Sequence, residues 1–223
     1  MSIRYTDPTS RSTSKEAASI YHKTSIIDLL NMSNILQLKV TLQGSSNPPI
    51  WRQVLVSDDI DFQQLHAIIQ GAMGWYNAHL HSFTDRWRSF DIGIPFDDGF
   101  STTTDGRTIR ISEYLAAKGD QLLYEYDFGD SWVHLIKVQK VLAPQAGQSY
   151  PQLLKGKGAC PPENCGGIWG YYDLVEAIND PKHESHEEMT EWMGIDHWDV
   201  HAFDLKEAQQ WVSRIFGKAK QLY

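Results

Sequence analysis

The sequence predicts an α+β domain in which helices cover a mostly antiparallel sheet. Three observations support this: strand-like alternation dominates the first two thirds of the chain, one strong helical pattern interrupts it early, and helical patterns fill the C-terminal part. The 223 residues suit one substantial domain. We therefore expect a single domain over residues 34–223, preceded by a flexible Ser/Thr-rich tail over residues 1–33.

The first strands follow from period-2 patterns. In LQLKVTL (36–42) apolar and polar residues alternate, as they do in a strand with one buried face. The loop GSSNPP separates this strand from a second one, IWRQVLV (50–56). HLHSFTDRW (79–87) predicts a further strand, and a long loop follows over residues 91–108.

The early helix follows from apolar residues at helical spacing. Asp59 or Asp61 is the candidate N-cap, and Gly74 is the candidate C-terminal residue. A second, short helix is predicted from Ser112 to Gly119. The buried stripe of the early helix would consist of Phe62, Leu65, Ile68, Ile69, Ala72 and Met73.

The stretch YEYDFGDSWVH (124–134) contains DFG, the triplet that holds magnesium in protein kinases. The kinase catalytic loop, glycine-rich loop and strand lysine are all missing from the sequence. Alternation on both sides of Gly129-Asp130 instead predicts a β-hairpin, with Gly129 at a position of positive φ. We therefore interpret DFG here as part of a turn.

Three helices are predicted in the C-terminal part, over residues 169–180, 181–194 and 204–217. The second would begin with Asp180 as N-cap and Pro181 at the first helical position. The third opens with DLKE, a variant of the capping box. The second helix is expected to bury His186, Met189, Trp192 and Met193.

The charge of the chain disfavours a general nucleic-acid binder. Lys and Arg number 20 against 28 Asp and Glu, and Lys155 with Lys157 is the nearest approach to a basic cluster. No apolar run approaches the length of a membrane span, so we expect no membrane partner. The first residues lack a secretory signal, which predicts a cytoplasmic location.

Five blocks occur in order along residues 34–216: LQLKVTLQGSSNPPIWRQVLV, LHAIIQGAMGWYNAHLHSF, YEYDFGDSWVHLIKV, ACPPENCGGIWGYYDLVEAI and DPKHESHEEMTEWMG. Together they resemble the plasmid pRiA4b ORF-3-like family, whose members also occur as insertion-element passenger proteins under the label TnpR. The resemblance implies a compact α+β domain, encoded on plasmids or mobile elements, with no established reaction. The blocks contain no serine or tyrosine recombinase active site, so resolvase activity is not carried over.

Cys160, Cys165, His183 and His186 form a C-x4-C-x17-H-x2-H pattern, which supplies four soft ligands for a tetrahedral zinc ion. The two histidines would share one face of a helix. The alternative is purely structural: His186 would be a packed core histidine, and the prolines of CPPENC would form a rigid turn. Apart from this zinc ion, no cofactor is predicted.

The hairpin supplies a second candidate constellation, Asp127, Asp130 and His134, to which Glu125, His79 and His81 are close in the predicted sheet. Two carboxylates beside a histidine can shift each other's pKa, as acid–base sites require. The alternative is an Asp that bonds its own turn.

A third candidate is the basic-aromatic stretch Arg86, Trp87 and Arg88, which could anchor a protein or stack on a nucleic-acid base. A strand-end tryptophan with solvated arginines is the alternative.

These observations favour a non-enzymatic accessory or interaction protein with an unknown protein partner, its fold clamped by zinc. Two alternatives stay open. One is a hydrolase-like enzyme using Asp127, Asp130 and His134. The other is a nucleic-acid-binding module of a transposition system.

Overall fold

The structure is a computed structural model that describes residues 33–95 and 102–222. The predicted tail over residues 1–33 therefore lies, apart from Ser33, outside the described residues. The described elements are β1 (Ile35–Leu42), β2 (Trp51–Ser57), α3 (Phe62–Met73), β3 (His81–Thr84), β4 (Ile92–Gly93), β5 (Thr104–Asp105), the 3-10 helix η1 (Ile111–Glu113), β6 (Gln121–Tyr126), β7 (Trp132–Leu142), β8 (Gln152–Lys157), α4 (Gly167–Asn179), α5 (His186–Met193) and α6 (Leu205–Leu222).

The strands form one eight-stranded sheet in the order β5-β4-β3-β6-β7-β1-β2-β8. All neighbouring pairs are antiparallel except β4 and β5, which are parallel. The first strand, β1, lies between β2 and β7, so that Val40 faces Arg52 on one side and Ile136 on the other. The predicted α+β class with a mostly antiparallel sheet is confirmed.

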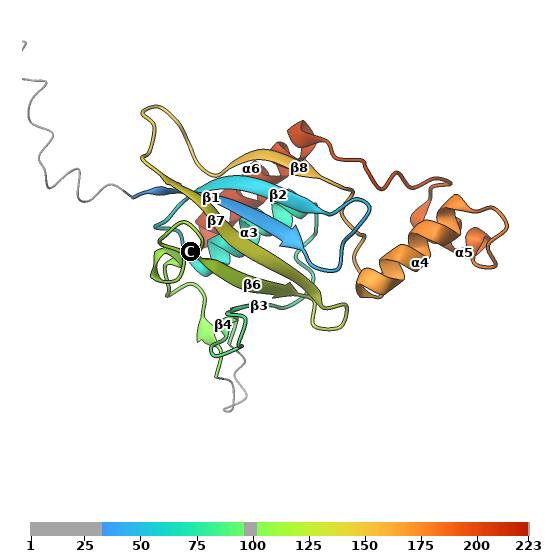
Figure 1. Cartoon of the computed structure of the whole chain (residues 1–223), viewed down its shortest axis with the longest axis horizontal. Coiled ribbons are helices and arrows are strands. Elements are labelled where there is room, and N and C mark those ends of the chain that lie inside the picture. The colour runs from blue at the N-terminus through green and yellow to red at the C-terminus, as the bar shows by residue number, and fades with distance from the viewer. Residues whose placement is uncertain (1–32, 96–101, 223) are drawn as a thin grey trace, which may run out of the picture. The chain divides into compact units, whose positions relative to one another are not determined.

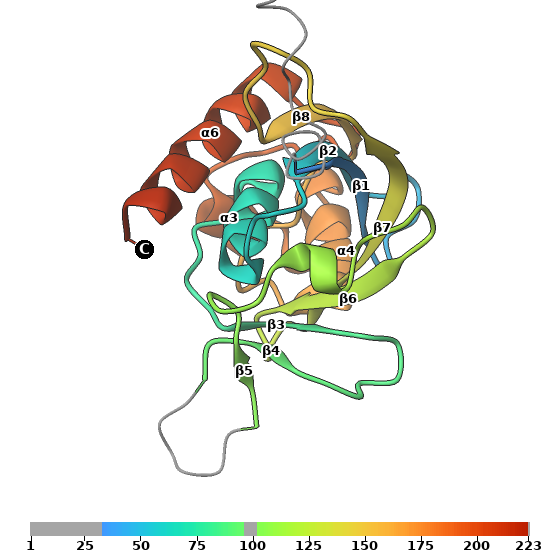
Figure 2. The same cartoon turned by 90° about the vertical axis from the view of Figure 1, so that its left-hand side faces the viewer.

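Alternation along the strands gives the sheet two different faces. In β1, Leu36, Leu38 and Val40 are buried, whereas Gln37 and Lys39 between them are half-buried. The strands lie in front of α3 and α6 in Figure 1, and the turned view in Figure 2 shows these two helices together on one side of the curved sheet. The core therefore lies between the apolar face of the sheet and α3 with α6.

The early helix α3 forms as its sequence predicts. The Asp61 side chain accepts a hydrogen bond from the Gln64 backbone, and the Gln64 side chain bonds back to Asp61, which completes a capping box. The helix ends at Gly74 in the left-handed conformation, with φ of 90°. Its packing against α6 is close, because a Cβ on Gly71 would lie only 2.7 Å from Val212 Cα.

Two helix predictions are wrong in extent. The helix expected from Ser112 to Gly119 is only the single 3-10 turn η1. The helix expected from Pro181 begins at His186, because the preceding residues form turns in which Asp180 accepts hydrogen bonds from the Lys182 and His183 backbones. None of the α5 residues is buried, and Trp192 is 49% exposed rather than part of the core.

Strand β8 was not predicted, because it falls in a segment rich in Pro and Gly, and β4 and β5 lie within the expected long loop. The capping residue of α6 is as predicted: Asp204 accepts a hydrogen bond from the Glu207 backbone. Within residues 33–95 and 102–222, no helix is both long and apolar enough to cross a membrane.

Candidate functional site

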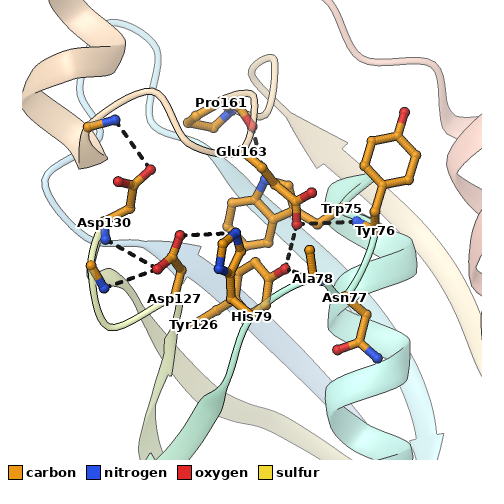
Figure 3. Close-up of polar contacts among 12 residues, drawn as sticks. Trp75, Tyr76, Asn77, Ala78, His79, Tyr126, Asp127, Asp130, Pro161 and Glu163 are labelled. Carbon is orange, nitrogen blue, oxygen red and sulfur yellow. Dashed lines mark hydrogen bonds and ion pairs between the residues drawn. The ribbon is translucent and has the colours of Figure 1, made fainter.

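Three loops meet at one end of the sheet, and we call this the three-loop site. It consists of residues 74–80 after α3, the hairpin turn 127–131 between β6 and β7, and residues 158–166 before α4. Figure 3 shows His79 facing Asp127 and Glu163 reaching toward Tyr126. Hydrogen bonds among these loops join segments that are far apart in the sequence.

The hairpin turn is held by Asp127, which has a positive φ of 57°. Its Oδ1 accepts hydrogen bonds from the Gly129 backbone at 3.0 Å and from the Asp130 backbone at 3.4 Å. Ser131 has the second positive φ, 54°. The prediction of a hairpin is confirmed, but the expected two-residue turn with positive φ at Gly129 is wrong, because Asp127 and Ser131 adopt the left-handed conformation instead.

Glu163 connects the loops. Its Oε1 accepts hydrogen bonds from the Tyr126 hydroxyl and, at 3.3 Å, from the Tyr76 backbone. The Tyr126 hydroxyl accepts in turn from the Ala78 backbone at 2.9 Å. Burial, and then the carboxylate of Glu163, raise the pKa of Tyr126 well above its ordinary value, so this hydroxyl keeps its proton and acts as the donor.

Two further bonds join the loop before α4 to its neighbours. The Trp75 indole donates its Nε1–H to the Pro161 carbonyl at 2.9 Å. On the other side, Asp130 Oδ2 accepts from the Gly166 backbone at 3.3 Å. Both contacts are drawn in Figure 3. The loop that contains CPPENC is therefore fixed to loop 74–80 at one end and to the hairpin at the other.

The candidate catalytic residues do not converge. Asp127 and Asp130 share the hairpin turn, but His134 lies inside the core with its Nδ1 2.9 Å from the Trp132 carbonyl. Burial lowers the pKa of His134 to about 4. The histidine that faces Asp127 is His79, whose Nε2 lies 3.4 Å from Asp127 Oδ2 at the half-exposed edge of the site. A catalytic role for the original three residues stays a prediction.

A second set of polar groups is buried beneath the three-loop site. His66 donates its Nε2–H to Asn77 Oδ1 and accepts from the Tyr124 hydroxyl at 2.9 Å. The His81 ring stacks on His66 with 3.5 Å between ring centroids. Burial lowers the pKa of His66 to about 4 and that of His81 to about 2, so both rings are neutral. These histidines support loop 74–80 from inside.

The cysteine and histidine blocks are placed as follows. Cys160 and Cys165 are half-buried free thiols of one loop, and burial raises the pKa of each to about 12. His183 accepts a hydrogen bond on Nδ1 from the Ser185 backbone, and His186 donates its Nδ1–H to the Ala177 carbonyl. In the described part of the chain, no group of three or more His, Cys, Asp or Glu side chains is arranged to hold a metal ion.

The basic-aromatic stretch is on the surface. Arg86 stacks on the Trp87 ring at 4.2 Å from its centroid, and Trp87 is 73% exposed. Arg88 pairs with Glu125 at 2.8 Å. One of the two arginines is thus neutralised within the domain.

The sequence did not reveal the exposed aromatic residues of the three-loop site and of the adjoining first turn of α4. Tyr76 is 76% exposed, Phe128 51% and Trp169 78%. One signal was available for Trp169, which falls outside the helical stripe that buries Tyr171 and Leu174.

The comparisons with known proteins agree with this fold. Residues 34–207 match the family described as plasmid pRiA4b ORF-3-like protein. The chain is 36% identical over 188 residues to the uncharacterised protein y4hQ of Sinorhizobium fredii (strain NBRC 101917 / NGR234), covering 84% of this chain and 95% of that protein. It is also similar to the crystal structure of MM3350, a protein of unknown function from Methanosarcina mazei Go1, with 33% identity, a TM-score of 0.69, and coverage of 79% of this chain and 98% of that one. The chain therefore belongs to the plasmid pRiA4b ORF-3-like family.

Proposed function

We propose that this protein is a non-enzymatic interaction module whose partner-binding surface is the three-loop site with the first turn of α4. The observation that carries the proposal is the exposure of Tyr76, Phe128 and Trp169 beside hydrogen-bonded loops. Large aromatic side chains are among the residues that contribute most to the binding free energy of protein interfaces. The partner is a protein.

The rigidity of these loops favours binding. Phe128 lies in the turn that Asp127 holds, and Tyr76 is bonded through its backbone to Glu163. Trp169 follows Gly166, which is bonded to Asp130. Because the loops are already ordered in the free domain, a partner would lose little conformational entropy from them on binding.

The family description supports a role connected with plasmids or other mobile elements, and the proposal includes a cytoplasmic location. A zinc ion on the CPPENC loop would stabilise the same surface, since that loop carries both cysteines. His186 offers a free Nε2 lone pair, because its Nδ1–H is donated to Ala177. His183 would have to release its bond to Ser185.

The test is quantitative affinity capture from the source cell with the tagged full chain, followed by titration of the captured protein in purified form. Phe128→Ser and Trp169→Ser should each weaken the purified complex at least tenfold. Trp87→Ser is the matched control, because Trp87 is 73% exposed, close to the 78% of Trp169, but lies outside the three-loop site. Equal affinity of all three variants and the wild type would refute the proposed surface.

An enzyme is the second candidate, and the pair formed by His79 and Asp127 favours it. A carboxylate beside a partly exposed histidine can orient the ring as a general base. Generic ester and phosphoester substrates test this with wild type and His79→Gln. Turnover that is lost in His79→Gln would support the enzyme and count against the interaction module.

A further inference from the structure

Lysines from three strands, β1, β7 and β8, form a row on the sheet face opposite α3 and α6, with Gln53 of β2 between them. The pairing register aligns Lys155 of β8 with Gln53 of β2, Gln53 with Lys39 of β1, and Lys39 with Lys137 of β7. Residues paired across neighbouring strands point to the same face. The row therefore spans three strand spacings, which is about 14 Å.

The next row adds an aromatic ring. Lys157 of β8 pairs with Trp51 of β2, which pairs with Thr41 of β1. The Lys39 ammonium lies 4.9 Å from the centroid of the Trp51 ring, and that of Lys155 lies 5.9 Å away. Two cations are thus held directly beside a partly exposed indole.

Glutamine side chains fill the space between the lysines. Gln139, at the bulge of β7, accepts hydrogen bonds from Gln37 and from Gln53. We define the lysine face as Lys39, Lys137, Lys140, Lys155, Lys157 and Trp51.

The charge of the lysine face is opposite to that of the whole chain. Strands β1, β2, β7 and β8 contain five lysines and no Asp or Glu. Nine acidic residues, by contrast, lie within residues 180–207, against two lysines. Exposed charges farther away than about 8 Å are largely screened at physiological salt. The local field of the lysine face is therefore positive although the net charge is −8.

We propose that the lysine face binds single-stranded nucleic acid. The lysines would neutralise phosphates, and the Trp51 ring would contact a base. A single strand fits better than a duplex, because its bases are free to reach the indole, whereas duplex bases are stacked on one another. In Figure 1 this face of the sheet points toward the viewer, with α3 and α6 behind it.

The arrangement extends the sequence-based prediction of a nucleic-acid module. That prediction used Arg86, Trp87 and Arg88, together with the pair Lys155 and Lys157. Lys39 and Lys137 belong to the same surface only because the strand order brings β1 and β7 beside β2 and β8. Spacing along the sequence could not show this.

The experiment is fluorescence anisotropy of the full chain with a labelled oligothymidylate about 15 nucleotides long. Each neutralised phosphate contributes about −0.7 to the slope of log affinity against log salt, so five lysines predict a slope near −3.5. Affinity should then fall roughly 100-fold between 50 and 200 mM salt. Lys39→Gln combined with Lys155→Gln should make the slope shallower by about 1.4.

Two further variants separate the lysine face from general charge effects. Trp51→Leu should weaken binding about tenfold without changing the salt slope, because it removes stacking but no charge. Lys182→Gln with Lys206→Gln is the matched control, since both lysines are exposed in the acidic C-terminal part, and it should leave affinity unchanged. Thermal unfolding shows that each variant is folded before it is titrated.

Four results would overturn the proposal. The first is the lack of saturable binding at 50 mM salt, and the second is a loss of affinity in the Lys182/Lys206 control that equals the loss in the Lys39/Lys155 variant. The third is an affinity for a duplex of the same length that matches or exceeds the affinity for the single strand, and the fourth is tighter binding to phosphatidylserine vesicles than to the oligonucleotide. Vesicle binding of that kind would identify the lysine face as a membrane-surface site instead.

Discussion

The Tyr126 hydroxyl donates a hydrogen bond to the Glu163 carboxylate, which joins the end of β6 to the loop before α4 across 37 positions of the sequence. The same hydroxyl accepts a hydrogen bond from the Ala78 backbone, so this one oxygen bonds to loop 74–80 and to loop 158–166. The Tyr126 hydroxyl therefore links loop 74–80 to the loop before α4.

Tyr126→Phe removes this oxygen and leaves both partners without their bond. Hydrogen bonds to charged groups contribute about 1.5–3 kcal/mol, so the unfolding free energy should fall by about 2 kcal/mol. Urea unfolding measures the change. Tyr150→Phe is the control, because the Tyr150 hydroxyl only accepts a 3.4 Å bond from Gln145 on the surface, and it should change stability by less than about 0.5 kcal/mol.

Acid should destabilise the domain through its buried histidines. His66 and His134 have a pKa of about 4 in the folded chain, against about 6.5 when unfolded. Between these values the unfolded chain binds protons that the folded chain does not, so the unfolding free energy falls as the pH falls from 6.5 to 4. Each histidine accounts for about 3 kcal/mol over this range.

His81, whose pKa burial lowers to about 2, should add to this acid sensitivity, and the variant His81→Phe tests its share. A phenyl ring can keep the stack on His66 and removes the buried Nδ1, which has no hydrogen-bond partner among residues 33–95 and 102–222. Thermal unfolding of the variant should depend less on pH between 4 and 6.5 than that of the wild type. The exposed His201→Gln should follow the wild-type curve. An unchanged slope in His81→Phe would show that His81 does not contribute to the acid sensitivity.

Two glycine substitutions should change stability in opposite directions. Gly71→Ala places a methyl group 2.7 Å from Val212 Cα in α6 and should cost about 1–2 kcal/mol despite the better helix propensity of alanine. Gly217→Ala meets no atom within 4 Å in the same helix pair and should stabilise by up to about 1 kcal/mol. Denaturant unfolding measures both changes in unfolding free energy. Equal changes in the two variants would contradict the close packing of α3 and α6 at Gly71.

Two substitutions of Asp127 distinguish a structural role in the turn from a role in catalysis. Asp127→Asn keeps an acceptor oxygen and tolerates positive φ, so stability should change by less than about 1 kcal/mol. Asp127→Ala loses both the acceptor and this tolerance and should cost about 1–3 kcal/mol. Activity lost in Asp127→Asn at unchanged stability would instead indicate a charge requirement and favour the enzyme.

Elemental analysis of protein purified without a His-tag tests the zinc hypothesis. It predicts one equivalent of zinc, lost in Cys160→Ser together with a lower melting temperature. Ser213→Ala serves as a control variant, because Ser213 lies on the surface of α6, away from both cysteines. Wild-type protein that contains no metal would contradict the hypothesis that the CPPENC loop binds zinc.

Local patterns predicted much of the fold. The alternation around Lys39 and the cap at Asp61 were sufficient for β1 and α3, because these signals depend only on neighbouring residues. The start of α5 was wrong because Asp180 is used in turn hydrogen bonds instead of a helix cap. Propensity alone does not decide between these two uses of an aspartate.

The sites were less predictable because they depend on long-range neighbours. Asp127, Asp130 and His134 were grouped from the hairpin sequence, but the histidine that faces Asp127 is His79 from another loop, and His134 of its own hairpin lies in the core. A hairpin places alternate residues on opposite faces, so His134 in β7 points into the core while the turn remains outside. The sequence placed His79 only among the neighbours of the hairpin, whereas the folded chain shows that it is the histidine that faces Asp127.

The position of β1 in the sheet also affects how the chain folds during synthesis. One of its two partners, β2, follows within a few residues, but β7 begins at Trp132, about ninety residues later. Until β7 has been made, the hydrogen-bonding groups along one side of β1 have no partner in the sheet, and such an open strand edge can pair with another chain. Because β1 and β7 are far apart in the sequence, the centre of the sheet should form slowly. Newly made chains are thus most prone to aggregation before the hairpin of β6 and β7 leaves the ribosome.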